Sequence, residues 1–197
     1  MLRNFALVTV SLALGCAHPE TAVRPDAGLL PYPGARNILD ACVADSTCTT
    51  LIDVPGAGLN RADELLATAL RTGSGIIAHD WRPETPPATC VAVGSLQHAK
   101  NPPPLVFEAV KRAKIAARPR DDCEAVVDGA GWAIALRDSR ERAVLLTVPA
   151  IIPPIGDTVQ LSTSYEAGML WSVTWLCDYV WRGDHWRANR CVAFGIS

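Results

Sequence analysis

The last forty residues of the chain, 158–197, constrain its fold more strongly than any other stretch. From Trp171 to Trp181, every second residue is a large apolar side chain or a cysteine. Such alternation is typical of a β-strand with one buried face, because successive side chains leave opposite faces of the pleat. After the polar segment Arg182–His185 the alternation resumes, from Trp186 to Ile196. The pattern predicts two long antiparallel strands whose aromatic face forms the protein core.

Chain length and charge limit the broad class of protein. With 197 residues, the chain is long enough for one domain with a substantial core and a small additional subdomain. Apolar residues make up 49% of the chain and charged residues 19%, a balance that indicates a globular fold rather than a disordered one. The net charge is only −2 and no half of the chain is strongly basic, which argues against a nucleic-acid partner.

The N-terminus carries the pattern of an export signal. Arg3 precedes an apolar run from Phe5 to Leu14, which is too short to span a bilayer, since a spanning helix needs about 20 apolar residues. Its length suits the hydrophobic region of a signal peptide. The run ends in Leu12-Ala13-Leu14-Gly15-Cys16, which resembles the lipobox of bacterial lipoproteins, although Ala13 stands where that pattern usually has leucine.

The lipobox resemblance implies a signal peptide over residues 1–15 and diacylation of Cys16. Several acyl chains on one protein give stable membrane anchoring. Ala17 stands where an aspartate would imply retention in the inner membrane. The resemblance therefore favours the bacterial cell envelope, with the protein lipid-anchored in the outer membrane and facing the periplasm or the surface. An ordinary secretory signal cleaved near Ala17 and a buried N-terminal helix are the alternatives.

Residues 16–36 are expected to form a flexible tether between the anchor and the folded part. Prolines and glycines recur between His18 and Arg36 too densely for a regular helix or strand. The expected partners are the membrane, through the lipid, and a protein of the envelope. No cofactor is expected.

The seven cysteines predict a set of disulfide bonds. Without the lipid-bearing Cys16 six remain, an even number, and an exported protein meets an oxidising environment. Six cysteines allow 15 connectivities, of which we favour the most local one. That set pairs Cys42 with Cys48, Cys90 with Cys123 and Cys177 with Cys191. A zinc site is the competing interpretation, but the sequence has no CxxC pair and no histidine at ligand spacing from a cysteine.

The last of these pairs conflicts with the simplest strand register. A tight turn at Gly183-Asp184 pairs Trp181 with Trp186, and the same register sets Cys177 opposite Arg190 rather than Cys191. Either a bulge of one residue shifts the pairing, or one of the two cysteines bonds elsewhere.

Residues 37–80 are expected to form a small helical subdomain. Apolar spacing predicts a short helix over Asn37–Asp45, and Asn60 resembles the N-cap of a second helix that stops at Gly73. Ile76–Ala78 is expected to be a short strand. The sequence leaves open whether this subdomain packs on the sheet or stands apart from it.

Residues 86–197 are expected to form an α+β domain. They contain a predicted strand over Thr89–Val93, a helix from Pro102 to Arg118, a hairpin of Trp132–Leu136 with Ala143–Val148, and a strand from Thr158 that turns at Glu166–Gly168. Cys123 and its acidic neighbours are expected in a loop. The predicted fold class is therefore α+β, with helices packed on a curved antiparallel β-meander that disulfides staple.

The C-terminal half, from Cys90 to Ser197, resembles uncharacterised bacterial proteins that are secreted or lipid-anchored. The residues that carry the resemblance are Pro104, Cys123, Tyr165, Gly168, Trp186 and Ile196-Ser197. Gly195 stands where that pattern usually has tryptophan, and the resemblance implies no activity. A helix on a curved meander also resembles cystatin-like and NTF2-like scaffolds, which host many functions.

No catalytic signature occurs, since the sequence has neither GxSxG nor HExxH. We therefore expect a non-enzymatic envelope lipoprotein that serves as a binding or interaction module, with no catalytic residue and no metal site. The first alternative is a small-ligand pocket between helix and sheet, lined by Trp and Tyr side chains. The second is a hydrolase that uses His79 or His185 with a nearby carboxylate.

Overall fold

The computed structural model describes residues 36–44, 58–81, 87–129, 131–151, 155–169 and 171–196. Three α-helices lie in these ranges: α1 (Ile38–Ala44), α3 (Arg61–Asp80) and α4 (Pro104–Arg112). The same ranges hold two 3-10 turns, η1 (Leu96–His98) and η2 (Arg120–Asp122). The strands described are β1 (Ala88–Val93), β2 (Ala117–Pro119), β3 (Cys123–Asp128), β4 (Gly131–Leu136), β5 (Ala143–Val148), β6 (Thr158–Gly168), β7 (Trp171–Trp181) and β8 (Trp186–Ile196). The predicted α+β class is confirmed.

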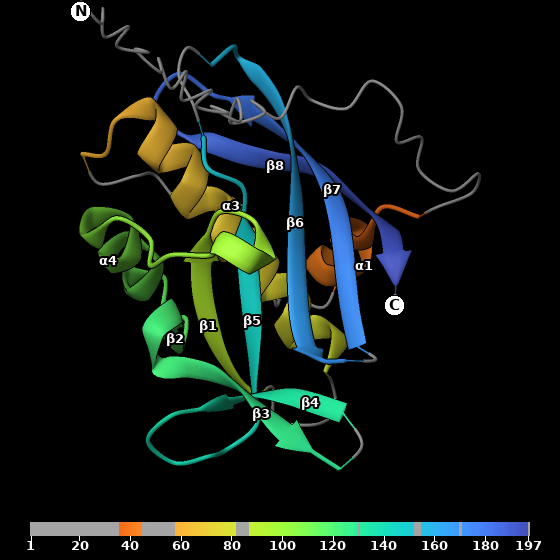
Figure 1. Ribbon diagram of the computed structural model, residues 1–197. Helices are drawn as coiled ribbons and strands as arrows, with labels where there is room; N and C mark the ends of the chain where they lie inside the picture. The colour runs from red at the N-terminus through yellow and green to blue at the C-terminus, as the bar shows by residue number, and fades with distance from the viewer. Residues whose placement is uncertain are drawn as a thin grey trace, which may run out of the picture.

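The described strands form one open, mixed sheet. Strand β1 lies between β2 and β5 and is parallel to both, whereas the β5–β6, β6–β7 and β7–β8 pairs are antiparallel. Figure 1 shows the long strands β6, β7 and β8 beside the shorter β5 and β1. The predicted antiparallel meander is therefore right for β6 to β8 and wrong for the β2–β1–β5 edge.

Strands β1 and β5 bury side chains on both faces of the sheet. On the first face, Val91 and Leu146 belong to a large hydrophobic cluster that includes the helices. On the second face, Cys90 and Leu145 belong to a smaller cluster with β3 and β4. Both strands consequently read as continuous apolar runs, which is usual for parallel strands that are covered on both sides.

Helix α3 is the main cover of the first face. Asn60 caps its N-terminus as predicted, and its side-chain oxygen accepts hydrogen bonds from the N–H groups of Ala62 and Asp63, both at 3.0 Å. The helix then continues to Asp80. The predicted stop at Gly73 and the predicted strand over Ile76–Ala78 are therefore wrong.

Close packing explains why α3 runs through a glycine-rich segment. A Cβ atom on Gly73 would lie 2.8 Å from Cδ1 of Leu146 and 3.1 Å from Cγ2 of Thr163, so the missing side chain lets the helix approach β5 and β6 closely. Each glycine costs a helix about 1 kcal/mol relative to alanine. Full burial of Ile76 and Ile77 in the same helix offsets that cost, since burying one such side chain is worth about 1.5–3 kcal/mol.

The helices that precede the sheet in sequence are attached to its last strand. The backbone N–H of Cys191 donates to Oδ1 of Asn37 at 2.9 Å, and Nε1 of Trp186 donates to the carbonyl oxygen of Arg61 at 2.9 Å. The Arg61 guanidinium also lies over the Trp181 and Trp186 rings, 4.8 and 5.2 Å from their centroids. Helices α1 and α3 thus share one core with the sheet, which answers the question that the sequence left open.

Strands β7 and β8 form the predicted antiparallel pair, with Trp181 opposite Trp186. Asn189 is left out of the pairing, and this bulge sets Cys177 opposite Cys191. The two cysteines are bonded, with their Cα atoms 4.1 Å apart. The bulge alternative is therefore confirmed, and the conflict between register and disulfide disappears.

The bulge also decides which side chains of β8 face the core. Cys191 belongs to the large cluster, whereas Val192, which unbroken alternation would place there, does not. On β7 the alternation holds for the central residues, because Trp175 and Tyr179 are fully buried. It fails at the start of the strand, where the Trp171 side chain is 51% exposed.

A hairpin of β3 and β4 crosses the second face of the sheet, and Figure 1 shows it in front of β1 and β5. Strand β4 pairs with β6 through Ala133 and Gly168, and a single bridge joins Ala135 to Arg142, the residue before β5. The two predicted strands are thus present, but the predicted hairpin between them is reduced to this one bridge, because β4 pairs mainly with β3. Cys123 begins a strand rather than lying in a loop. Helix α4 also ends earlier than predicted, at Arg112, because residues 117–119 form β2 beside β1.

Candidate functional site

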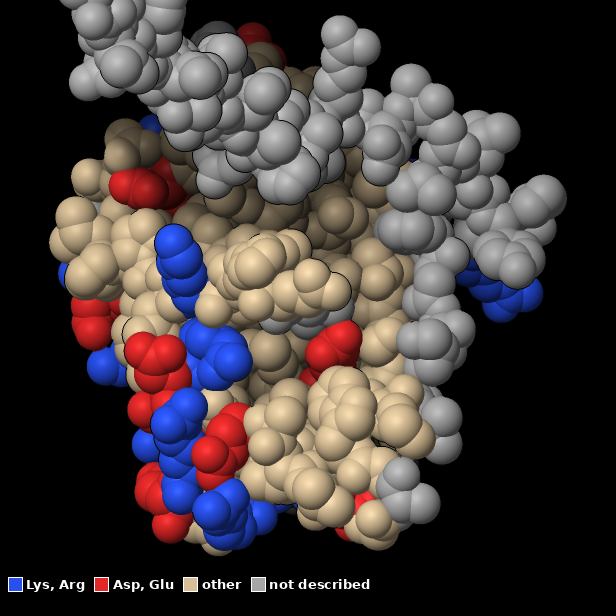
Figure 2. All heavy atoms as spheres, viewed as in Figure 1, with Lys and Arg blue, Asp and Glu red and all other residues tan. Residues whose placement is uncertain are grey.

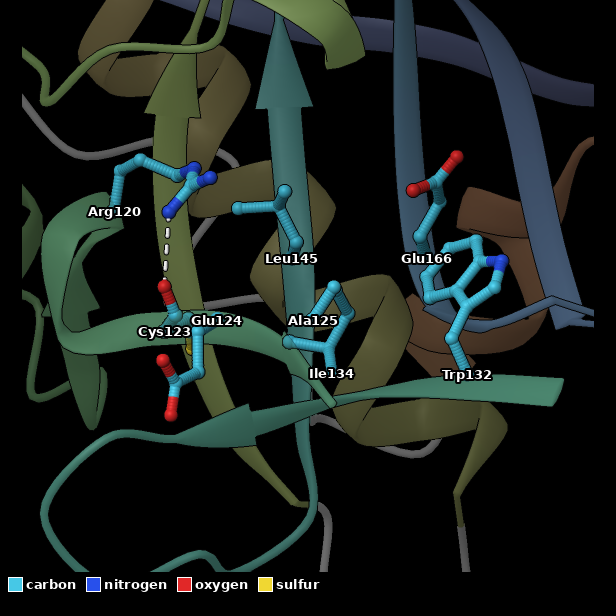
Figure 3. A pocket seen from close by; sticks show the side chains of 8 residues that line it. All are labelled: Arg120, Cys123, Glu124, Ala125, Trp132, Ile134, Leu145 and Glu166. Carbon is cyan, nitrogen blue, oxygen red and sulfur yellow. Dashed lines mark hydrogen bonds between the residues drawn. The ribbon is translucent and has the colours of Figure 1, made fainter. Parts of the chain in front are cut away.

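A cavity of about 300 Å³ lies between the hairpin and the second face of the sheet. This volume is at the lower end of the range of small-molecule sites, about 300–1,000 Å³. Turn η2 and strand β3 supply Arg120, Cys123, Glu124 and Ala125 to its walls, and β4, β5 and β6 supply Trp132, Ile134, Leu145 and Glu166. Figure 3 shows these side chains around the opening.

The cavity exists because the hairpin is held at its two ends. At one end the Cys90–Cys123 disulfide ties β3 to β1, with the Cα atoms 6.3 Å apart. At the other end, the N–H of Met169 donates to the carbonyl oxygen of Trp132 at 3.0 Å. Gly168 permits this approach, since a Cβ atom there would lie 2.7 Å from the same oxygen. Between these attachments β3 has no strand partner besides β4 in the described part of the chain, and the space remains open.

Arg120 stands at one end of the cavity. Its Nη1 donates to the carbonyl oxygen of Cys123 at 2.9 Å, which fixes the guanidinium over the start of β3. Its Nε is buried and has no hydrogen-bond partner among the described residues. In Figure 3 the guanidinium points from η2 toward Leu145. Because the Arg120 side chain lines the cavity and has no carboxylate bound to it in the described structure, its guanidinium is suited to an anionic group of a ligand.

Glu166 stands at the opposite end, on β6, with the indole of Trp132 beside it (Figure 3). No hydrogen bond or ion pair to this carboxylate occurs within the described residues. Partial burial raises the pKa of Glu166 above its ordinary value, because desolvation disfavours the charged form. The carboxylate therefore gains from any ligand that brings it a positive charge or a hydrogen-bond donor.

The other charged groups near the cavity pair with each other. Glu124 pairs with Arg140, and Arg142 pairs with Asp128 at 2.9 Å. Figure 2 shows the result on this face, where acidic and basic side chains form a mixed group on one side and uncharged surface covers most of the other. Arg120 and Glu166 remain as the two charged groups of the cavity without an opposite charge bound to them in the described structure.

The residues singled out in the sequence lie elsewhere. His185 contacts Asp184, its neighbour in the β7–β8 turn, with 2.6 Å between Nδ1 and Oδ1, and His79 lies at the end of α3. Neither histidine lines the cavity. Among the described residues, no group of three or more His, Cys, Asp or Glu side chains is placed to hold a metal ion.

Four of the predicted disulfide cysteines are paired as the local set requires, Cys90 with Cys123 and Cys177 with Cys191. Cys42 is also in a disulfide. Its predicted partner Cys48, and the predicted lipidation site Cys16, lie outside the described residues. Of the paired cysteines, Cys123 is the one that touches the cavity.

The expected pocket between helix and sheet is filled by protein. Trp175, Tyr165 and Tyr179 are buried in the large cluster beneath α3, and the cavity lies on the other face with Trp132 as its aromatic wall. Sequence reasoning missed both polar ends: Glu166 was expected in a turn, and Arg120 was not considered. No local signal identifies them, because 46 positions separate them in the chain.

The first face contains a charged pair that the sequence also did not reveal. Within α3, Nη2 of Arg71 lies 3.4 Å from Oε1 of Glu64, and both side chains are at most 2% exposed. Thr68 accepts a 2.8 Å hydrogen bond from the same nitrogen. Desolvation raises the pKa of Glu64, and that of Arg71 is lowered by the same cause. This pair is sealed from solvent, so we assign it to the core and not to a site.

Two further findings bear on the function. None of the described helices combines the length and apolar composition needed to cross a bilayer. No family model, no curated protein and no solved structure matches this chain, so the cavity is interpreted from its own residues.

Proposed function

We propose that the chain is a non-enzymatic lipoprotein of the bacterial cell envelope that binds a small molecule in the cavity under the β3–β4 hairpin. The observation that carries the proposal is the placement of two charged groups without an opposite charge bound to them in the described structure, Arg120 and Glu166, at the two ends of a cavity whose middle is apolar. Leaving such groups partly desolvated and without an opposite charge costs stability, so their presence on a preformed concave surface favours a binding role.

The cysteines and the N-terminus support a location outside the cytoplasm. Disulfides between buried cysteines, as in Cys90–Cys123 and Cys177–Cys191, persist in oxidising compartments and are rare in the cytosol. The lipobox-like segment ending at Cys16, and the tether expected over residues 16–36, support attachment to a membrane. We place the protein at the outer membrane, where the tether lets the binding domain work at a distance from the lipid.

The chemistry of the cavity supports binding rather than catalysis. None of the described residues that line it carries a hydroxyl, imidazole or amine, and the sulfur of Cys123 is held in a disulfide. Nucleophilic catalysis by a hydroxyl, thiol or amine needs such a group together with a base within hydrogen-bond reach. The carboxyls of Glu124 and Glu166 come from different strands, and Glu124 is already paired with Arg140.

Anchoring is tested by expressing the full chain in a bacterial host that is fed a clickable palmitate analogue. We expect the label on the protein and the protein in the membrane fraction, with both lost in Cys16→Ser. A conservative change at another predicted cysteine, Cys48→Ser, is the control and should keep the label. Label that persists in Cys16→Ser, or a protein that stays soluble and unlabelled, would contradict the anchor.

Ligand binding is tested by blocking the cavity. Ala125 is an exposed residue of β3 that lines the cavity, so Ala125→Phe should fill the space without disturbing the core. Full-length protein in a non-ionic detergent is screened by thermal shift against a panel of small molecules, and hits are repeated on the variant. We expect hits that disappear in Ala125→Phe and persist in Ala150→Phe, a matched change on an exposed loop. Hits that survive in both variants would place binding elsewhere.

A further inference from the structure

The end of the cavity at Glu166 has the features of a cation site. The carboxylate is partly buried without a partner in the described structure, and the Trp132 ring lies beside the stem of the same side chain (Figure 3). An ammonium group placed there would form a charge-assisted hydrogen bond with the carboxylate. The face of an indole ring attracts a cation as well, most strongly where water is partly excluded. Water alone would satisfy the carboxylate but would not make use of the aromatic wall.

The end at Arg120 has the features of an anion site. One nitrogen of the guanidinium is bound to the Cys123 carbonyl oxygen, which holds the plane in place, and the buried Nε has no partner among the described residues. A planar guanidinium binds carboxylates through paired hydrogen bonds. Preorganisation by the first bond lowers the entropy that a ligand carboxylate must overcome.

Between the two ends the surface is apolar. Leu145 forms the floor on β5, and Ala125 and Ile134 line the hairpin side (Figure 3). Glu124, the remaining charged group of the lining, is paired with Arg140 and does not compete for a ligand cation. Along the cavity, the order is thus the guanidinium of Arg120, which can bind an anion, then the apolar wall, and then the carboxylate of Glu166, which can bind a cation.

We propose that the cavity binds a small zwitterion in which a carboxylate and an ammonium group are separated by an apolar segment. The carboxylate pairs with Arg120, the apolar segment lies on Leu145 and Ile134, and the ammonium group lies between Glu166 and Trp132. Apolar amino acids, ω-amino acids and short peptides share this chemistry. The inference rests on the proposed binding function and adds to it the class of ligand and its orientation.

The test uses probes that differ only in their ends. Isothermal titration calorimetry on the full-length protein in non-ionic detergent, at neutral pH, compares 6-aminohexanoate with hexanoate and with hexylamine. Each charge-assisted contact is worth about tenfold or more in affinity, so 6-aminohexanoate should bind at least about tenfold more tightly than either single-ended probe. 4-Aminobutanoate and 8-aminooctanoate extend the series and show which spacing fits.

Two substitutions assign the ends. Glu166→Gln should weaken 6-aminohexanoate about tenfold and leave hexanoate unchanged, whereas Arg120→Gln should weaken 6-aminohexanoate and hexanoate and leave hexylamine unchanged. Arg120→Lys retains the charge and should bind with intermediate affinity. Glu108→Gln and Arg112→Gln on the exposed side of α4 are the matched controls and should change nothing. Urea unfolding of every variant shows that the fold is retained.

The outcomes separate the ligand class from the function. Three results would each overturn the proposal of a zwitterionic ligand. They are equal affinities for all three six-carbon probes, no binding by any of the three ω-amino acids, and loss of affinity in the α4 controls. If another chemical class binds and Ala125→Phe abolishes that binding, the class is wrong and the binding function stands. If no compound binds in a way that Ala125→Phe abolishes, the proposed function fails together with the inference.

Discussion

The two faces of the sheet are covered in different ways. Helix α3 lies along the first face, and the large side chains beneath it, such as Trp175 and Tyr179, are fully buried. The β3–β4 hairpin crosses the second face, where a smaller cluster is buried and a cavity of about 300 Å³ remains. The same two strands, β1 and β5, contribute to both faces.

The difference shows that the element packed on a sheet face, and the way it is attached, determine whether that face is filled or keeps a cavity. A helix spreads side chains all round its axis and fills the space above a sheet, provided that small residues such as Gly73 let it come close. A hairpin that is fixed only at its ends forms a bridge over the sheet, because β3 pairs with β4 alone and β4 meets the rest of the sheet only near its two ends. We therefore expect the first face to determine stability and the second to determine binding.

The largest effect should come from a tryptophan on the first face. Trp175→Ala removes one of the largest fully buried side chains of the protein, and such truncations cost about 3–5 kcal/mol. The matched change on the second face, Trp132→Ala, affects a partly buried ring at the cavity wall and should cost about 1 kcal/mol. Urea unfolding measures both, and similar losses would show that the two faces contribute equally.

The buried ion pair should come next. Arg71→Met leaves Glu64 without its partner in the core, and breaking such a pair costs about 3–5 kcal/mol. The double variant Glu64→Met/Arg71→Met should regain most of that loss, since both charges are then gone. Arg142→Met, which breaks the exposed Arg142–Asp128 pair on the hairpin side, should cost less than about 1 kcal/mol. A double variant as unstable as Arg71→Met alone would mean that packing, not charge, sets the cost.

The hairpin disulfide should have a mixed effect on stability and binding. Cys90→Ser/Cys123→Ser frees one attachment of the hairpin, at a cost of about 2–4 kcal/mol in the chain-entropy account. Ligand affinity should also fall, because Cys123 carries the carbonyl group that positions Arg120. Removing Cys177 and Cys191 in the same way should cost similar stability and leave affinity unchanged. The opposite assignment, with affinity lost only in the β7–β8 variant, would break the division of roles between the faces.

The smallest expected effect is a pH dependence that originates at Glu166. In the unfolded chain this carboxyl ionises at its ordinary value, and in the folded protein its pKa is raised by desolvation. Between the two values the folded state binds more protons, so the contribution of Glu166 to stability falls as the pH rises through this window. Glu166→Gln removes that contribution, so the thermal midpoint of the variant should rise relative to that of the unmodified protein as the pH increases above about 4.5. An unchanged difference across this range would show that the carboxyl titrates as if in water.

Local patterns predicted the parts of the fold that local interactions decide. The alternation from Trp171 to Trp181 placed β7 correctly, and Asn60 marked the start of α3. Gly73 misled because packing on Leu146 outweighs helix propensity, which no local window contains. The continuous apolar run of β5 carried the information that both faces are buried, but sequence adjacency made a hairpin with β4 the simpler interpretation.

The candidate site could not be predicted in the same way. Arg120, Trp132 and Glu166 lie on different elements, and none belongs to a motif. They meet because β1 and β5 pair in parallel and because Gly168 admits the Trp132 carbonyl oxygen, and both are tertiary events. What the sequence did contain was the cysteine pair that fastens one end of the hairpin.

The bulge at Asn189 links formation of the Cys177–Cys191 disulfide to the pairing register of β7 and β8. Only with this residue extruded do Cys177 and Cys191 lie directly across from each other. If Asn189 were paired within the ladder, Cys177 would lie opposite Arg190 and the two sulfurs would point to opposite sides of the sheet. The disulfide can therefore form in only one register of β8. A chain in which β8 is shifted by one residue is recognisable by the free thiols of Cys177 and Cys191.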